Sequence, residues 1–226
     1  CEAKLIRVSA CEHVLVLAID HMVTDAVSNQ ILNREIWTLY SQAVQGLPFS
    51  LPHLSVQFAD YAAWQHQTHK AWQESHEAYW KTRLAGAPCV EFPRDGLADE
   101  DHPIRATLQV SLGNQLSGRL RELARRAQTL LALVVLTAYV AVISRWCNRK
   151  DLVLTFLSHG RYRPELEDIV GFVATYMYLR VELSSEDTLL DLLKRINDEF
   201  YSAYNHHDFD RVPDLFPERT TDLCFN

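Results

Sequence analysis

Residues 17–28 read Leu-Ala-Ile-Asp-His-Met-Val-Thr-Asp-Ala-Val-Ser. They connect a continuous apolar run over residues 13–19 to an apolar stripe of helical spacing that starts at Leu32. The run predicts a strand buried on both faces, and the stripe predicts an amphipathic helix that ends at Gly46. Because a buried strand anchors the backbone, His21 at its end can enter a cleft. Asp25 lies at the turn into the helix, where a carboxylate can cap free amides or pair with an arginine.

Further strands and helices follow the same logic. Alternating residues predict strands over 3–8, 106–112 and 172–183, and an apolar run predicts a buried strand over 152–158. Helical spacing predicts two helices over residues 56–84 and a third helix whose apolar stripe covers residues 116–127. It also predicts a helix that ends near residue 146 and a last helix capped by Asp187 or Thr188. Residues 85–105 form a linker or crossover rich in turn residues. This order of elements predicts an α/β layered fold.

Composition narrows the function classes. With 48% hydrophobic and 23% charged residues, the chain is expected to be globular. Its net charge of −7 argues against a nucleic-acid or anionic membrane partner. The five scattered cysteines form no CxxC pair, which favours a reducing, cytoplasmic location. The most apolar stretch, residues 130–143, is short for a membrane span and predicts a core helix.

Three histidines, His66, His69 and His76, occur on one predicted helix. Metal sites need three or four converging ligands, and no cysteine or carboxylate cluster accompanies these residues. We therefore expect a solvated helix face and no metal site.

Six segments carry a resemblance that spans most of the chain. Residues 20–26 resemble the motif HHxxxDG, residues 55–64 Y-x-D-Y-A-V-W, and residues 77–88 A-Y-W-x-x-x-L-x-G-A-P. Residues 160–166 resemble N-R-x-x-P-E-L, residues 170–180 I-G-F-F-V-N-T…R, and residues 206–211 a shortened H-Q-D-x-P-F-E-R. In this order, the motifs resemble those of nonribosomal peptide synthetase condensation domains.

This resemblance implies a fold of chloramphenicol-acetyltransferase-like layered sheet-and-helix lobes. Residues 1–75 would be the remainder of an incomplete N-terminal lobe. Residues 76–226, with the crossover at 76–105, would be a C-terminal lobe truncated at its end. Since such domains are about twice this length, we expect that the chain alone does not catalyse condensation.

The resemblance also implies an activity and partners. Donor and acceptor peptidyl carrier proteins would present substrates on 4'-phosphopantetheine arms, and no cofactor would be bound directly. The acyl or peptidyl thioester would be attacked by the amine of the aminoacyl thioester, in a larger synthetase with a neighbouring adenylation domain.

Site roles follow from the match. His21 corresponds to the second histidine of the motif and could accept the ammonium proton or orient the amine. Asp25 would hold the motif turn through a buried ion pair, with Arg161 as its candidate partner. Ser28, Thr175 and Tyr176 are candidates for the tunnel or substrate contacts.

Two positions depart from the family motif. Asp20 replaces its first histidine, and Ala26 replaces its glycine. The amide of Ala26 is retained, and its Cβ matters only if the site needs a positive φ or a close approach of the thioester arm.

Two alternatives stay open. Asp20, Asp25 and Ser28 also fit the DxxxxDxxS pattern of heterocyclization domains, which generally lack the histidine kept here. The other alternative is a catalytically inactive, condensation-like docking domain.

Overall fold

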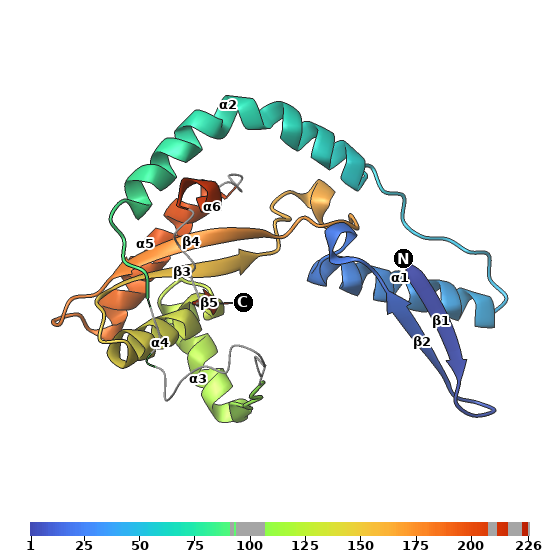
Figure 1. Ribbon diagram of the computed structural model, residues 1–226. Helices are drawn as coiled ribbons and strands as arrows, with labels where there is room; N and C mark the ends of the chain where they lie inside the picture. The colour runs from blue at the N-terminus through green and yellow to red at the C-terminus, as the bar shows by residue number, and fades with distance from the viewer. Residues whose placement is uncertain (91–92, 94–106, 208–211, 217–222, 226) are drawn as a thin grey trace, which may run out of the picture. The chain divides into compact units, whose positions relative to one another are not determined.

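The computed structural model describes residues 1–90, 93, 107–207, 212–216 and 223–225 (Figure 1). The chain divides into two compact units. The first comprises Cys1–Gln73 and Ser158–Thr175, and the second comprises Glu74–Leu157 and Tyr176–Asn226. The long helix α2 (Phe58–Leu84) contributes residues to both. The division into lobes 1–75 and 76–226 stays a prediction.

The first unit begins with an antiparallel hairpin, β1 (Glu2–Arg7) and β2 (His13–Ala18), in which Glu2 pairs with Ala18. A 3-10 turn, η1 (His21–Val23), leads into α1 (Ala26–Val44). A second 3-10 turn, η2 (Pro164–Leu166), lies in the later segment of this unit, Ser158–Thr175. Gly46 follows α1 with a φ of +69°, as expected for the glycine that ends this helix. A small core of Tyr61, Leu166, Ile169 and Val173, with Phe58 packed against it, joins α2 to the segment 158–175.

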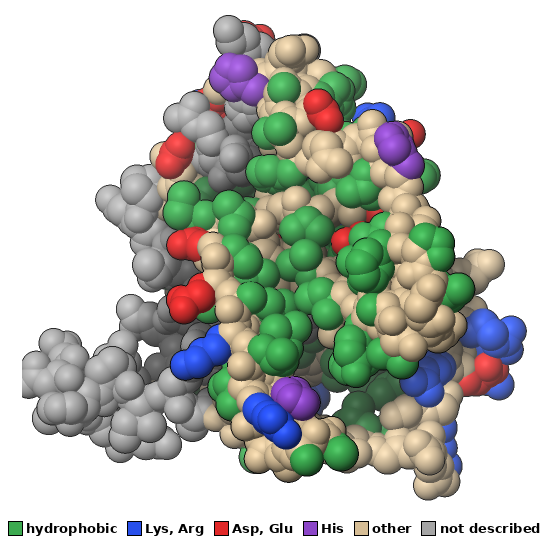
Figure 2. Space-filling model, turned by 90° about the vertical axis from the view of Figure 1, so that its right-hand side faces the viewer, with side chains coloured by type: hydrophobic (Ala, Val, Ile, Leu, Met, Phe, Trp, Pro, Cys, Tyr) green, Lys and Arg blue, Asp and Glu red, His purple; other side chains and the backbone are tan. Residues whose placement is uncertain are grey.

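The burial predicted for the strand at residues 13–19 is wrong. Every residue of β2 is exposed, and Val14 to Leu17 keep between 39% and 46% of their surface. A strand is buried on both faces only when layers cover both, and among the described residues this sheet has two strands and exposed faces. Hydrophobic side chains gather on the face of the molecule drawn in Figure 2.

The second unit contains a three-stranded sheet and the larger core. The strands β3 (Asp151–Ser158), β4 (Thr175–Glu182) and β5 (Cys224–Phe225) are ordered β4-β3-β5, and β3 and β5 are parallel. Helix α4 (Leu131–Trp146) packs against α3 (Gly113–Arg126) and α5 (Leu189–Tyr204), and α6 (Val212–Leu215) is short. Fully buried side chains from α4, β3, β4 and α5 form this core: Leu133, Leu136, Leu152, Leu154, Met177, Leu179 and Ile196.

Two local predictions for this unit are confirmed. Thr188 begins α5 with a capping box, in which its side chain and that of Asp191 accept hydrogen bonds from each other's backbone amides. Residues 131–146 form a helix with six buried side chains, as expected for a core helix. None of the helices in the described ranges could span a membrane alone, and α3 and α4 reach that length only together, across a bend of 105°.

Three element predictions are corrected. Residues 58–84 form one helix instead of two, because no glycine or proline interrupts them. Residues 107–112 form no strand, since alternation needs a hydrogen-bonding neighbour and the described strands do not include one beside them. The strand expected over 172–183 begins only at Thr175. Of the predicted linker, residues 91–92 and 94–105 lie outside the described residues, as do residues 208–211 of the last motif.

The sequence predicted that His76 lies on a solvated helix face, and this prediction is wrong. His76 is buried and lies beside His206. The Nδ1 atoms of the two rings lie 2.8 Å apart, so one donates a proton to the other. The ring of Tyr79 stacks on His206 at 3.8 Å, and Trp80 Nε1 donates to the His206 carbonyl at 3.2 Å. Burial, followed by the charge of His76, lowers the pKa of His206.

This pair makes the stability of the second unit pH-dependent. Because the pKa of His206 is lower in the folded chain, the folded state binds fewer protons than the unfolded state. The stabilisation is therefore present above about pH 6.5 and is lost as the pH falls below it. We expect the urea concentration at the unfolding midpoint to decrease when the pH is lowered from about 7.5 to about 5.5. The decrease should be smaller in His206→Gln, which lacks the titrating group. His53→Gln, at an exposed histidine, serves as control, and equal pH profiles for wild type and His206→Gln would contradict the prediction.

Candidate active site around His21

The side chain of His21 is exposed on a turn that is held from both sides. Asp20 caps η1, because its Oδ1 accepts a hydrogen bond from the amide of Met22 at 2.8 Å. His21 Nδ1 lies 2.7 Å from the carbonyl oxygen of Thr24. A carbonyl oxygen only accepts, so Nδ1 carries the proton and Nε2 of the neutral ring keeps its lone pair. The basic nitrogen is thus the one directed away from the turn's own backbone.

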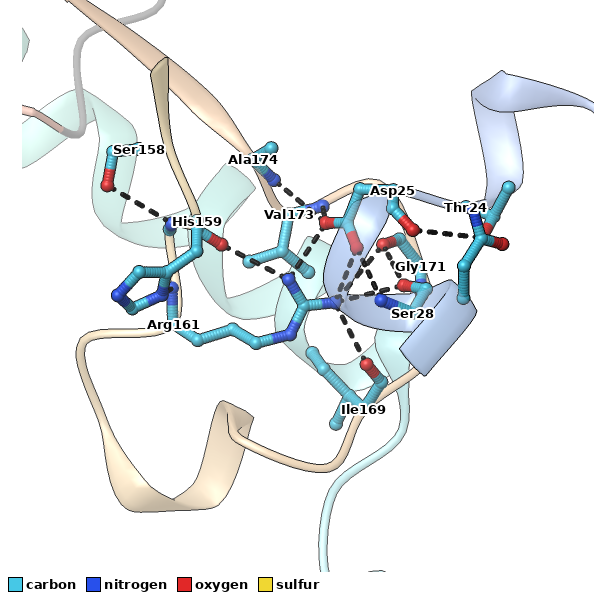
Figure 3. A network of polar contacts seen from close by, with 12 residues as sticks. Thr24, Asp25, Ser28, Ser158, His159, Arg161, Ile169, Gly171, Val173 and Ala174 are labelled. Carbon is cyan, nitrogen blue, oxygen red and sulfur yellow. Dashed lines mark hydrogen bonds and ion pairs between the residues drawn. The ribbon is translucent and has the colours of Figure 1, made fainter. Parts of the chain in front are cut away.

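Asp25 is the N-cap of α1 and forms a buried ion pair with Arg161 (Figure 3). Arg161 Nη1 lies 2.8 Å from Oδ2 and Nη2 lies 3.0 Å from Oδ1, which is a bidentate arrangement. Both side chains are only 2% exposed. The ion pair predicted between these two residues is present, and it links positions 136 residues apart.

The same network holds the segment that precedes β4. Asp25 Oδ2 accepts hydrogen bonds from the amides of Val173, at 3.0 Å, and Ala174, at 3.1 Å. Because these amides bond to a carboxylate, they are not available to a sheet ladder, which explains why β4 starts only after them. The ion pair therefore fixes both the His21 turn and residues 173–174.

Ser28 belongs to this network and not to an open surface. It is fully buried, its hydroxyl donates to the Gly171 carbonyl at 2.8 Å, and its oxygen accepts from the Gly171 amide at 3.0 Å. Arg161 Nη2 donates to the same oxygen at 3.0 Å and to the carbonyl of Ile169 at 3.1 Å. The expectation that Ser28 contacts substrate in a tunnel is therefore corrected, since this hydroxyl is fully used inside the protein.

The network keeps Asp25 charged. Burial by itself would raise the pKa of this carboxyl, but the hydrogen bonds from Arg161 and from the amides of Ser28 and Val173 outweigh it. The pKa is therefore held well below its ordinary value. A carboxylate already neutralised by a bidentate arginine is suited to a structural role and not to proton transfer.

Two glycines permit the close packing around this pair. Gly160 has a φ of +68°, and a Cβ at this position would lie 2.0 Å from the Val173 carbonyl oxygen. A Cβ at Gly171 would lie 2.2 Å from the ring of Phe58. Both positions exclude a side chain, because backbone or a packed ring occupies the space.

The remaining predicted site residues, Ala26, Thr175 and Tyr176, follow segments that the network holds. Ala26 is the exposed first residue of α1 and has no positive φ, so alanine replaces the motif glycine without backbone strain. Thr175 is half-buried at the start of β4, and Tyr176 beside it is exposed.

Sequence reasoning missed two contacts of His21. The carbonyl of Thr24 orients its Nδ1, and the ring of Phe172 lies at its edge, 5.4 Å between centroids and 72° between planes. Backbone acceptors leave no signal in the sequence. For Phe172 the signal was its place in the glycine-phenylalanine motif, which we had assigned to a strand.

Comparisons with known proteins identify the family of this chain. The sequence pattern of the condensation domain family matches residues 1–212. The chain belongs to the condensation domain family. Malpibaldin synthetase of Mortierella alpina is 34% identical over 222 residues, which cover 94% of this chain and 4% of that protein.

Solved structures share the fold. The X-domain from teicoplanin biosynthesis superimposes with a TM-score of 0.80 at 24% identity, over 96% of this chain and 50% of that one. The first condensation domain of the calcium-dependent antibiotic synthetase, in complex with substrate analogue 3a, superimposes with a TM-score of 0.79 at 19% identity. The superposition covers 99% of this chain and 50% of that one. The predicted α/β, layered fold is thus confirmed, and the chain spans about half the length of these structural neighbours.

Removing Arg161 is expected to destabilise the first unit strongly. Arg161→Met leaves Asp25 buried without its cation, which costs about 3–5 kcal/mol in the free energy of unfolding. Arg34→Met is the matched control, because the Arg34–Asp168 pair at 2.6 Å is 58% and 52% exposed. This exposed pair is expected to contribute less than about 1 kcal/mol. Urea unfolding measures both variants, and equal losses would contradict the role of the buried pair.

Gly160→Ala is expected to reduce the free energy of unfolding by more than about 2 kcal/mol, since it adds both backbone strain and a clash with the Val173 carbonyl. Gly118→Ala is the control, because it lies in α3 with open space around it. There alanine is expected to stabilise by up to about 1 kcal/mol through helix propensity. Thermal unfolding distinguishes the two, and a neutral Gly160→Ala would refute the expected contact.

Proposed function

We propose that this chain carries the general-base histidine of a condensation domain that forms amide bonds in nonribosomal peptide synthesis. The observation that carries the proposal is the exposed imidazole of His21, whose Nδ1 is committed to the Thr24 carbonyl and whose Nε2 is available. Membership of the condensation domain family supports the reaction type. In the proposal, the chain acts within a larger cytoplasmic synthetase, with donor and acceptor carrier proteins and an adjacent adenylation domain.

The chemistry assigns one proton transfer to His21. The amine of the aminoacyl thioester attacks the carbonyl carbon of the donor thioester, so that a C–N bond forms and the C–S bond breaks. The nitrogen loses one proton, which Nε2 accepts, and the departing pantetheine thiolate takes up one proton. A neutral imidazole with one fixed tautomer is suited to this step.

The buried network supplies position in this mechanism. Asp25 and Arg161 neutralise each other out of contact with solvent, so neither is available to take a proton from substrate. Their role is to keep the turn that presents His21 in one conformation. Pre-organisation of this kind lowers the entropic cost of bringing the base to the amine.

The heterocyclization alternative has less support from the geometry. Asp25 and Ser28 are buried and hydrogen-bonded within the protein, whereas Asp20 is exposed and caps η1. The three residues of that pattern therefore do not present side chains to one substrate. The inactive docking domain is the alternative that an assay must separate.

His21→Ala in the synthetase that we propose contains this chain is expected to reduce amide formation by at least about 10²-fold, because the base is lost. The exposed position of His21 predicts an unchanged urea midpoint. His13→Ala, on exposed β2, is the matched control and should condense normally. Product is measured by mass spectrometry after mixing with loaded donor and acceptor carrier proteins.

Other outcomes of this assay are informative. We expect no product from the isolated 226-residue chain. Carrier binding without product in the wild-type synthetase would favour the docking domain. A product lighter by the mass of one water would favour heterocyclization, and normal turnover by His21→Ala would refute the proposal.

A further inference from the structure

Phe172 occupies a position that core packing does not explain. Its side chain is 42% exposed, although both of its chain neighbours, Gly171 and Val173, are buried. It belongs to neither buried cluster of the described residues. Its recorded ring contact is with His21, 5.4 Å between centroids in a T-shaped arrangement. An exposed phenylalanine that gains little from burial therefore lies directly against the exposed imidazole.

The position of Phe172 is fixed through the backbone on either side of it. The Gly171 amide and carbonyl bond to Ser28, and the Val173 amide bonds to Asp25. Asp25 and Ser28 also begin the helix that follows the His21 turn. The same buried network thus sets both ends of the contact, the imidazole on one segment and the phenyl ring on another.

A second restraint on the imidazole has a clear physical consequence. The hydrogen bond from Nδ1 to Thr24 fixes one atom of the ring but leaves the ring able to tilt about that bond. A T-shaped aromatic neighbour limits this tilt, and such pairs contribute beyond simple burial. Hydrogen bond and ring contact together define one direction for Nε2.

We propose that Phe172 is a positioning residue for His21, which holds the imidazole so that Nε2 faces the reacting amine. The inference rests on the proposed function for its catalytic consequence, and on geometry alone for the ring contact. Because Phe172 is partly exposed and outside the buried clusters, its substitution should leave the fold intact.

The first experiment measures the contact without any activity. In the 226-residue chain labelled with ¹⁵N-histidine, two-dimensional NMR reports the ring-proton shifts and the tautomer of His21, which is assigned with His21→Ala. Phe172→Leu should remove the ring-current shift on the His21 ring protons and leave the tautomer unchanged, because the Thr24 carbonyl still holds Nδ1, whereas Phe172→Tyr should retain the ring-current shift. Phe49→Leu, at an exposed phenylalanine elsewhere in the first unit, should change neither. Unchanged His21 signals in Phe172→Leu would overturn the proposal.

The second experiment measures the consequence in the synthetase. We expect Phe172→Leu to lower kcat about tenfold with KM within about twofold, because a misdirected base affects the chemical step and not binding. Phe172→Tyr should restore kcat, and Phe49→Leu should match wild type. Normal kcat in Phe172→Leu, with His21→Ala inactive, would refute this inference and leave the proposed function standing. Full activity of His21→Ala would instead refute the proposed function, whatever Phe172→Leu shows.

Discussion

The buried ion pair between Asp25 and Arg161 is the constraint on which the first unit depends. Two charges taken out of water are costly unless their remaining hydrogen-bonding capacity is used. Here it is used in full on the carboxylate. Oδ1 accepts from the Ser28 amide and Arg161, and Oδ2 accepts from Arg161 and two amides of residues 173–174. The pair thereby determines how two segments far apart in the sequence meet.

This arrangement separates support from chemistry. The charged groups of Asp25 and Arg161 are buried, where they neutralise each other and bond to backbone amides and carbonyls, while the imidazole of His21 is exposed. A rigid interior next to an exposed, oriented side chain is what a reacting base requires. Gly160 and Gly171 are needed for the same packing. A Cβ at Gly160 would displace the backbone of Val173, and a Cβ at Gly171 would displace the ring of Phe58.

Much of the local structure could be predicted because its causes are local. Asp25 and Thr188 precede helices and cap them, Gly46 ends α1 with a positive φ, and the apolar run before Trp146 forms the core helix α4. The family motifs identified His21, and Arg161 was the candidate partner of Asp25 because its turn follows a predicted core strand. Predictions failed where a neighbour decides the outcome, as for the exposed strand β2 and for residues 107–112, whose alternation alone does not make a strand.

By itself, the sequence determined most of the helices, the caps at Asp25 and Thr188, the layered α/β class of the fold, and the family to which the His21 motif belongs, because spacing and side-chain type act over a few residues. Only the tertiary structure decided that Ser28 is an internal hub, that the Thr24 carbonyl selects the tautomer of His21, and that Phe172 lies at the imidazole. These outcomes depend on hydrogen bonds and ring contacts between backbone and side chains, some of them separated by more than 130 residues. Such contacts exist only once the chain has folded.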